Sequence, residues 1–172
     1  MSITFEMILI ISIHNVDNHP CFAIFIKDDK GDYNIMRCIG IIGAMEVEVA
    51  SLKEQMKDIQ VTRKASMEFY SGIIEGKNVV VVRSGIGKVN AAFKAYDVIQ
   101  RTGCKTLINF GTAGSSSFPR HALVEIGQFV QRDMDVSPLG FPVGTTPMDD
   151  EHPTEIKLDR YFLELPHAVC GT

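Results

Sequence analysis

A short segment near residue 40 constrains the fold of this chain more than any other. Residues 38–42 form an apolar, strand-like run, and Gly43 follows as a tight turn. Directly behind this turn the pattern becomes helical and carries two carboxylates, Glu46 and Glu48. In α/β folds, ligands bind in the crevice at the carboxyl ends of such strands. The segment therefore predicts an α/β domain with a candidate acid or base at its ligand-binding edge.

Strand-like and helical patterns alternate along the rest of the chain. A helix is predicted for residues 45–57, where apolar residues recur at intervals of four, three and four. A second predicted helix runs to about residue 101, with Thr102 and Gly103 as its end signal. Further strands are predicted at residues 68–74, 79–83, 105–110 and 124–131. This alternation favours a mixed or mainly parallel sheet with helices on both faces.

Three predicted strand ends are rich in small residues and are expected to meet at one edge of the sheet. They are residues 43–45, 84–87 and 111–114. Small residues let a planar ligand approach the backbone and leave amide N–H groups free to donate. Glu48 lies about 60° around the helix from Met45, at the margin of the apolar stripe, so we expect it beside the core near these ends. These features together favour a binding pocket with Glu48 as its acid or base.

Composition and spacing argue against several other functions. A formal net charge of −4 does not favour nucleic-acid binding, and no basic run indicates a membrane-binding patch. The four cysteines lack CxxC spacing, which favours reduced thiols and a cytoplasmic setting. The five histidines lack metal-ligand spacing, and residues 84–89 do not match a P-loop. A metal-free mechanism that uses carboxylates fits best.

Three motifs resemble one enzyme family in the same order along the chain. They are Ile39-Gly-Ile-Ile-Gly-Ala-Met-Glu-Val-Glu-Val49, Ser84-Gly-Ile-Gly-Lys-Val-Asn-Ala-Ala92 and Asn109-Phe-Gly-Thr-Ala-Gly114. The chain resembles the 5'-methylthioadenosine/S-adenosylhomocysteine nucleosidases of the nucleoside phosphorylase superfamily, from about residue 36 to residue 172. The resemblance implies a three-layer α/β/α fold with a mixed, mainly parallel sheet. It also implies hydrolysis of an adenine N-glycosidic bond without metal or cofactor.

The resemblance assigns roles to individual residues of this chain. Glu48 is expected to orient and deprotonate the attacking water. The residues expected to line the nucleoside site are Ala44, Met45, Ile86, Thr112, Ala113 and Gly114. The family is dimeric, and a loop of one subunit closes its partner's pocket; the matching residues are Val136, Leu139 and Pro147. The expected partners are thus an adenine nucleoside and a second copy of the chain.

The resemblance also implies that the domain is incomplete at its C-terminus. The aspartate that protonates the leaving adenine, and the Met-Glu pair that holds the ribose, would lie beyond Thr172. Two alternatives to the hydrolase stay open: a phosphorylase that uses phosphate in place of water, and a non-catalytic nucleoside-binding or dimerisation remnant. Residues 1–35 are interpreted as an N-terminal extension of unknown role, and residues 36–172 as the nucleosidase-like domain.

Overall fold

The computed structural model describes residues 6–15, 25–27, 33–35, 38–64, 67–149 and 154–172. They form two compact units, each described here by itself. The larger unit comprises Ile13–Thr112, and the smaller comprises Met1–Ser12 with Ala113–Thr172. Among the described residues, no helix has both the length and the apolar character needed to cross a membrane.

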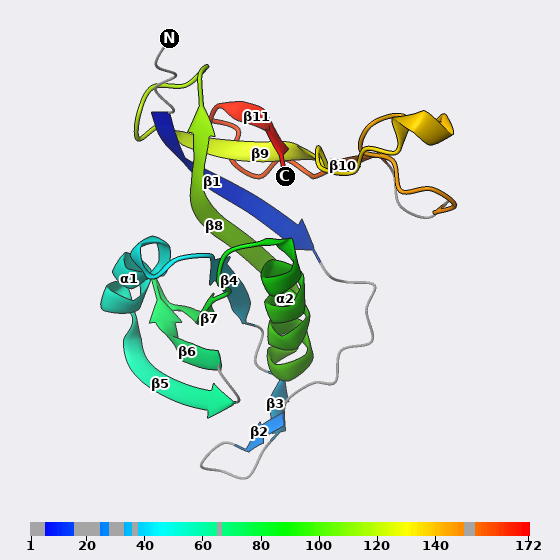
Figure 1. The fold of residues 1–172 in the computed structure, drawn as a ribbon. Helices are drawn as coiled ribbons and strands as arrows, with labels where there is room; N and C mark the ends of the chain where they lie inside the picture. Colours follow the sequence, from blue (N-terminus) through cyan, green and yellow to red (C-terminus); the bar gives the residue numbers. More distant parts are fainter. Residues whose placement is uncertain (1–5, 16–24, 28–32, 36–37, 65–66, 150–153) are drawn as a thin grey trace. The chain divides into compact units, whose positions relative to one another are not determined.

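The larger unit is built around five hydrogen-bonded strands, in the order β8-β4-β7-β6-β5 (Figure 1). Their bounds are β4 Ile39–Gly43, β5 Lys57–Lys64, β6 Met67–Ile74, β7 Lys77–Arg83 and β8 Thr106–Ser115. Strand β4 is parallel to β7 and β8, whereas β6 is antiparallel to β5 and β7. A separate hairpin of β2 (Phe25–Lys27) and β3 (Tyr33–Ile35) completes the strands of this unit.

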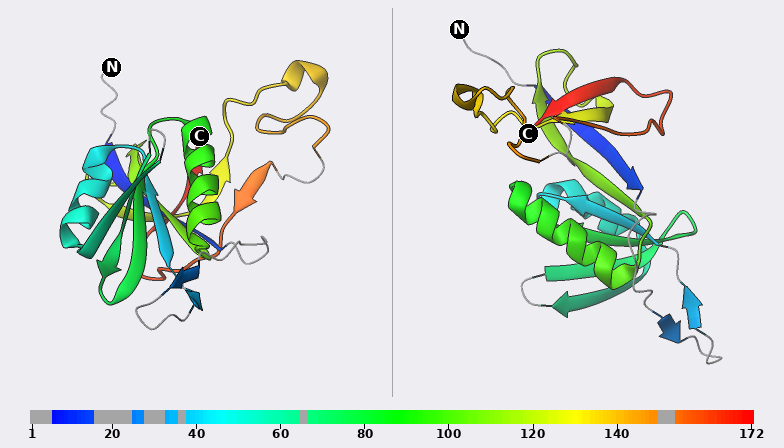
Figure 2. Two further views of the ribbon diagram at one scale, coloured as in Figure 1. Left: turned by 90° about the horizontal axis from the view of Figure 1, so that it is seen from below. Right: turned by 90° about the vertical axis from the view of Figure 1, so that its right-hand side faces the viewer.

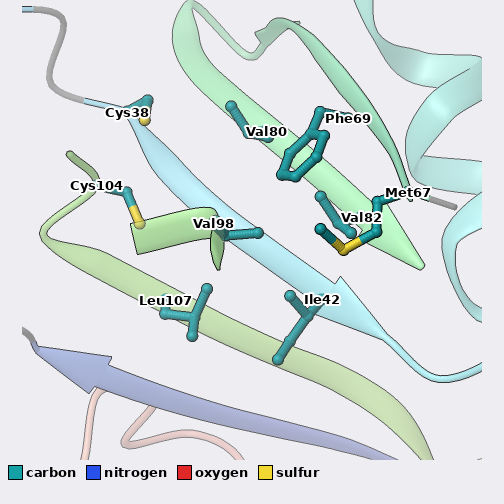
Figure 3. Close-up of a cluster of buried hydrophobic side chains, with 9 residues drawn as sticks. All are labelled: Cys38, Ile42, Met67, Phe69, Val80, Val82, Val98, Cys104 and Leu107. Carbon is teal, nitrogen blue, oxygen red and sulfur yellow. The ribbon is translucent and has the colours of Figure 1, made fainter. Parts of the chain in front are cut away.

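Two helices cover opposite faces of these strands: α1 (Glu46–Gln55) and α2 (Lys88–Thr102) (Figure 2). Successive side chains of a strand point to opposite faces, so neighbouring residues of β4 and β7 enter different cores. The core on the α2 face contains Cys38, Ile42, Met67, Phe69, Val80, Val82, Val98, Cys104 and Leu107 (Figure 3). The core on the α1 face contains Ile41, Val49, Met56, Val79 and Val81. The predicted three-layer α/β/α arrangement with a mixed sheet is confirmed.

Local sequence signals explain where several elements begin and end. The residues between β6 and β7, Glu75 and Gly76, both have positive φ, as in a two-residue hairpin turn. Helix α2 ends at Gly103, which adopts the left-handed conformation and donates its N–H to the carbonyl of Ile99. Glycine at residue 43 is required by close packing, because a Cβ there would lie 2.7 Å from Val49 Cγ1. The turn at Glu75 and Gly76 and the helix end at Gly103 were predicted correctly, whereas Gly43, predicted as a turn, is the last residue of β4.

Two predicted boundaries are wrong. Residues 57–64 form β5, where the sequence pattern suggested only the end of a helix and a connection. Strand β8 continues through Gly111–Gly114 to Ser115, so these residues are strand rather than a turn at a strand end. In both cases hydrogen bonding to neighbouring segments stabilises an extended backbone that local propensity does not favour.

The smaller unit is organised around strand β9 (Leu123–Val130). Strands β1 (Glu6–Asn15) and β11 (His167–Gly171) pair with β9 in parallel, and β10 (Glu155–Lys157) pairs with it antiparallel. Val124 and Ile126 are its buried apolar residues. In the described part of the proline-rich segment between β9 and β10 lies a short 3₁₀ helix, η1 (Ser137–Leu139).

Candidate functional site

Glu48 is buried at the start of α1, with a relative exposure of 5%. Its Oε2 accepts the backbone N–H of Met45 at 2.8 Å, and its own N–H donates to the Met45 carbonyl at 3.1 Å. A glutamate at the third helical position that bonds back to the cap residue stabilises the helix start. The sequence predicted Glu48 at the margin of the core, and the structure buries it.

Thr112 of β8 holds the other oxygen of the same carboxylate. Glu48 Oε1 accepts the backbone N–H of Thr112 at 2.9 Å and its hydroxyl at 2.8 Å. Gly111 leaves room for this contact, since a Cβ there would lie 3.4 Å from Oε1. Parallel pairing of β4 with β8, from Ile39 opposite Thr106 to Ile42 opposite Asn109, brings these distant residues together.

The turn after β7 lies beside the turn after β4. Ser84 is buried, its backbone N–H donates to the Gly43 carbonyl at 2.8 Å, and its hydroxyl lies 3.3 Å from the same oxygen. Ala44 and Met45 are half-buried next to this contact, while Ile86 is 74% exposed. The predicted strand ends 43–45 and 84–87 therefore lie side by side. From the third, 111–114, Thr112 reaches this site through its hydrogen bonds to Glu48.

The surroundings of Glu48 are polar but uncharged. Its carboxylate accepts three hydrogen bonds, and within the described part of the chain no cation pairs with it. A carboxylate offers about four acceptor sites, so one remains for a further donor such as a water molecule. No group of three or more metal-ligating side chains occurs among the described residues. The arrangement provides an oriented base with one acceptor site to spare.

The other predicted site residues belong to the smaller unit. Ala113 and Gly114 continue β8, half-buried and exposed respectively. Val136 and Pro147 are half-buried, and Leu139 is 72% exposed at the end of η1. Hydrogen bonds from the side chain and backbone of Ser137 hold the pKa of the neighbouring Asp135 below its ordinary value. These residues shape the proline-rich segment.

The sequence reading missed a second buried carboxylate, Glu125 of β9, which is 2% exposed. Its Oε1 accepts the backbone N–H groups of Tyr161 at 2.7 Å and Phe162 at 3.2 Å. The guanidinium of Arg160 lies 3.8 Å from its Oε2. A charged residue within the apolar run 123–130 was the signal, because a buried charge requires partners.

A three-layer α/β/α unit with an oriented carboxylate at the carboxyl ends of its strands is the architecture of a ligand-binding α/β enzyme domain. The family model described as "Phosphorylase superfamily" matches residues 38–169. The chain therefore belongs to the phosphorylase superfamily.

Relatives of known name fall in one branch of this superfamily. The 5'-methylthioadenosine/S-adenosylhomocysteine nucleosidase of Staphylococcus haemolyticus is 38% identical over 135 residues, which are 77% of this chain and 58% of that protein. The nucleosidase of Anoxybacillus flavithermus is 41% identical over 111 residues, 63% of this chain and 48% of that protein. The chain thus spans about half the length of the relatives it matches.

A solved structure shares the fold. The Colwellia psychrerythraea nucleosidase in complex with adenine aligns with a TM-score of 0.53 and 28% identity, covering 71% of this chain and 50% of that one. The assignment to the phosphorylase superfamily made from the three motifs is confirmed.

Proposed function

We propose that this protein hydrolyses the N-glycosidic bond of 5'-methylthioadenosine or S-adenosylhomocysteine-type nucleosides and releases adenine. The single observation that carries the proposal is the carboxylate of Glu48, buried, held by three neutral donors and left with one acceptor site. The names of the most similar relatives support the same substrate class.

Glu48 would act on the attacking water. Bond cleavage builds positive charge on the ribose, which a nearby carboxylate stabilises while it accepts a proton from the water. Met45 N–H and the two donors of Thr112 fix the orientation of the carboxylate, so the remaining lone pair is aimed before substrate arrives. We assign Ala44, Met45, Ile86, Thr112, Ala113 and Gly114 to the nucleoside site.

Phosphorolysis is the second candidate, because one cation lies at the same edge of the sheet. Arg83 ends β7 directly opposite Gly43 in the strand register, and its side chain is exposed. A guanidinium at a strand end suits an incoming phosphate. Hydrolysis remains our proposal, since the oriented base is Glu48 and phosphate needs no base to activate it.

Adenine release from 5'-methylthioadenosine tests this proposal on the 172-residue chain, with and without phosphate. We expect phosphate-independent release that is lost in Glu48→Gln and kept in Glu46→Gln. Glu46 is the matched control, because it lies two residues away, is exposed and pairs with Lys53 at 2.8 Å. Phosphate-dependent release would point to the phosphorylase. Nucleoside binding without release by a folded sample would favour the non-catalytic remnant.

We also propose a homodimer, supported by a second apolar face on α2. Val89, Phe93 and Tyr96 follow one another in α2 at intervals of four and three residues, and all are at least 60% exposed. Val98, which packs into the core, lies on the other side of the helix. Apolar side chains at this spacing suit pairing with the same face of a second copy. Val136, Leu139 and Pro147 would then contribute to the partner's pocket.

Light scattering coupled to size exclusion measures this association. Phe93→Glu is expected to give monomers, whereas Val47→Glu, which changes an equally exposed valine on α1, is expected to leave the dimer intact. A monomeric wild-type chain would contradict the proposal.

We place the domain boundary at residue 36, with residues 1–35 as an extension, supported by a family match that begins at residue 38. Because β1 pairs with β9, deletion of residues 1–35 is a direct test. Unchanged adenine release by residues 36–172 is expected, and loss of release or of folding would contradict the boundary.

We propose a cytoplasmic location, since Cys38 and Cys170 are free thiols in the described part of the chain, which suits a reducing compartment. Cell fractionation tests this, and recovery from the secreted fraction would contradict it.

A further inference from the structure

The larger unit contains a cavity of about 410 Å³ on the α2 face of the sheet, opposite the face that carries α1. It is lined by residues at the amino ends of β4 and β7 (Cys38, Asn78, Val79) and by the last turn of α2. Glu48, Gly43 and Ser84 lie at the carboxyl ends of the same strands. Its wall residues Phe69 and Val80 belong to the core on the α2 face, whereas α1 carries Glu48 on the other face. None of the predicted site residues lines it, so it is a separate site.

The floor of the cavity is apolar and its margin is polar. Phe69, Ile73 and Val80 form the floor from β6 and β7. The margin comes from alternate residues of β5, namely Asp58, Gln60, Thr62 and Lys64. A volume of this size, with an apolar wall and a few polar groups, is typical of a small-molecule site.

Two cations give the cavity a preference for a negatively charged group. Arg101 lies with its guanidinium carbon 5.7 Å from the Phe69 ring centre. The Nε–H of Arg101 donates to Asp97 Oδ2 at 2.6 Å. The two terminal nitrogens of the guanidinium carry four further N–H donors. Thr62 is opposite Phe69 in the strand register, and Lys64 is two residues further along β5, about 7 Å away. Asp58, the one acidic residue among the described residues of the lining, lies six positions before Lys64 in β5.

We propose that this cavity binds a small amphipathic anion, with a carboxylate, sulfonate or phosphate group on an apolar body. The anionic group pairs with Lys64 and Arg101, and the apolar body covers Phe69, Ile73 and Val80. Because Ile86 just precedes α2 and Arg101 lies in its last turn, the helix connects the proposed nucleoside site with this second site.

Fluorescence titration with 8-anilinonaphthalene-1-sulfonate tests the proposal on the full chain. We expect saturable binding at one site per chain, displaced by octanoate and not by 5'-methylthioadenosine. Lys64→Gln should weaken binding about fivefold, and the double change Lys64→Gln with Arg101→Gln about twentyfold. Ser71→Phe, which places a ring in the cavity, should abolish binding, with circular dichroism confirming the fold.

Arg63→Gln is the matched control. Arg63 precedes Lys64 in β5, carries the same charge and points to the opposite face of the strand. Equal weakening by Arg63→Gln, displacement by 5'-methylthioadenosine, or binding unchanged in Ser71→Phe would each overturn the proposal. Absence of saturable binding to the folded chain would overturn it as well.

Discussion

Glu48 and Glu125 are both buried carboxylates held by backbone amides, yet they are compensated in different ways. Glu125 receives the N–H groups of Tyr161 and Phe162 and has Arg160 beside it, all from one short segment. Glu48 receives only neutral donors, from Met45 and from Thr112. A buried carboxylate with a cation beside it is compensated by that charge, whereas one held by neutral donors alone keeps more of its capacity to accept a proton.

The largest expected effect separates the two carboxylates by activity. Glu48→Gln removes the base and should lower the rate of adenine release about a thousandfold, within the range of general base catalysis. Glu125→Gln should leave the rate per folded molecule within about twofold. Initial rates of adenine release, normalised to the amount of folded protein, measure the effect of each variant. A comparable loss of rate in both variants would show that the two carboxylates do not differ in their role.

The second effect separates them by stability. Glu125→Gln turns one acceptor oxygen into a donor facing backbone N–H groups and leaves Arg160 without its anion. We expect a loss of about 2–3 kcal/mol in the free energy of unfolding. Urea denaturation of the chain, followed by circular dichroism, measures the change. Arg160→Gln should cost less, because its side chain is 42% exposed.

A third effect tests how Glu48 is oriented. Thr112→Val removes the hydroxyl that donates to Oε1 at 2.8 Å, while its backbone N–H remains. Loss of one hydrogen bond to a charged group should lower kcat about tenfold with little change in KM. Thr112→Ser keeps the hydroxyl and should restore most of the rate. Equal rates for the valine and serine variants would exclude this role.

The smallest effect uses Glu68, an exposed carboxylate with comparable partners. The Tyr70 hydroxyl and Arg63 hold the pKa of Glu68 below its ordinary value. A lowered folded-state pKa contributes stability above the unfolded pKa, and this contribution is lost as pH falls through the folded value. Tyr70→Phe should raise the pKa of Glu68 in an NMR titration without a measurable change in Tm, because solvent screens the site. A clear fall in Tm would show that the hydrogen bond between Tyr70 and Glu68 contributes to stability despite solvent screening.

Local signals made much of the larger unit predictable. The hairpin at Glu75 and Gly76 and the helix end at Gly103 each follow from backbone conformations that few residues adopt, and Gly43 follows from the close approach of Val49. Strand β5 could not be predicted in the same way. All eight of its residues are exposed, so it lacks the apolar alternation of a half-buried strand, and it forms by pairing with β6.

The sequence by itself determined the α/β class, the superfamily and the identity of Glu48 as the leading carboxylate. The motifs that indicate these features are short segments, and each can be recognised without knowing which distant residues it contacts. Only the tertiary structure decided that Glu48 is buried, that Thr112 donates to it and that Glu125 forms a second buried carboxylate. Glu48 and Thr112 are 64 residues apart, and they meet because parallel β4 and β8 fix their register. That register depends on the packing of both helices against the sheet, which no single segment contains.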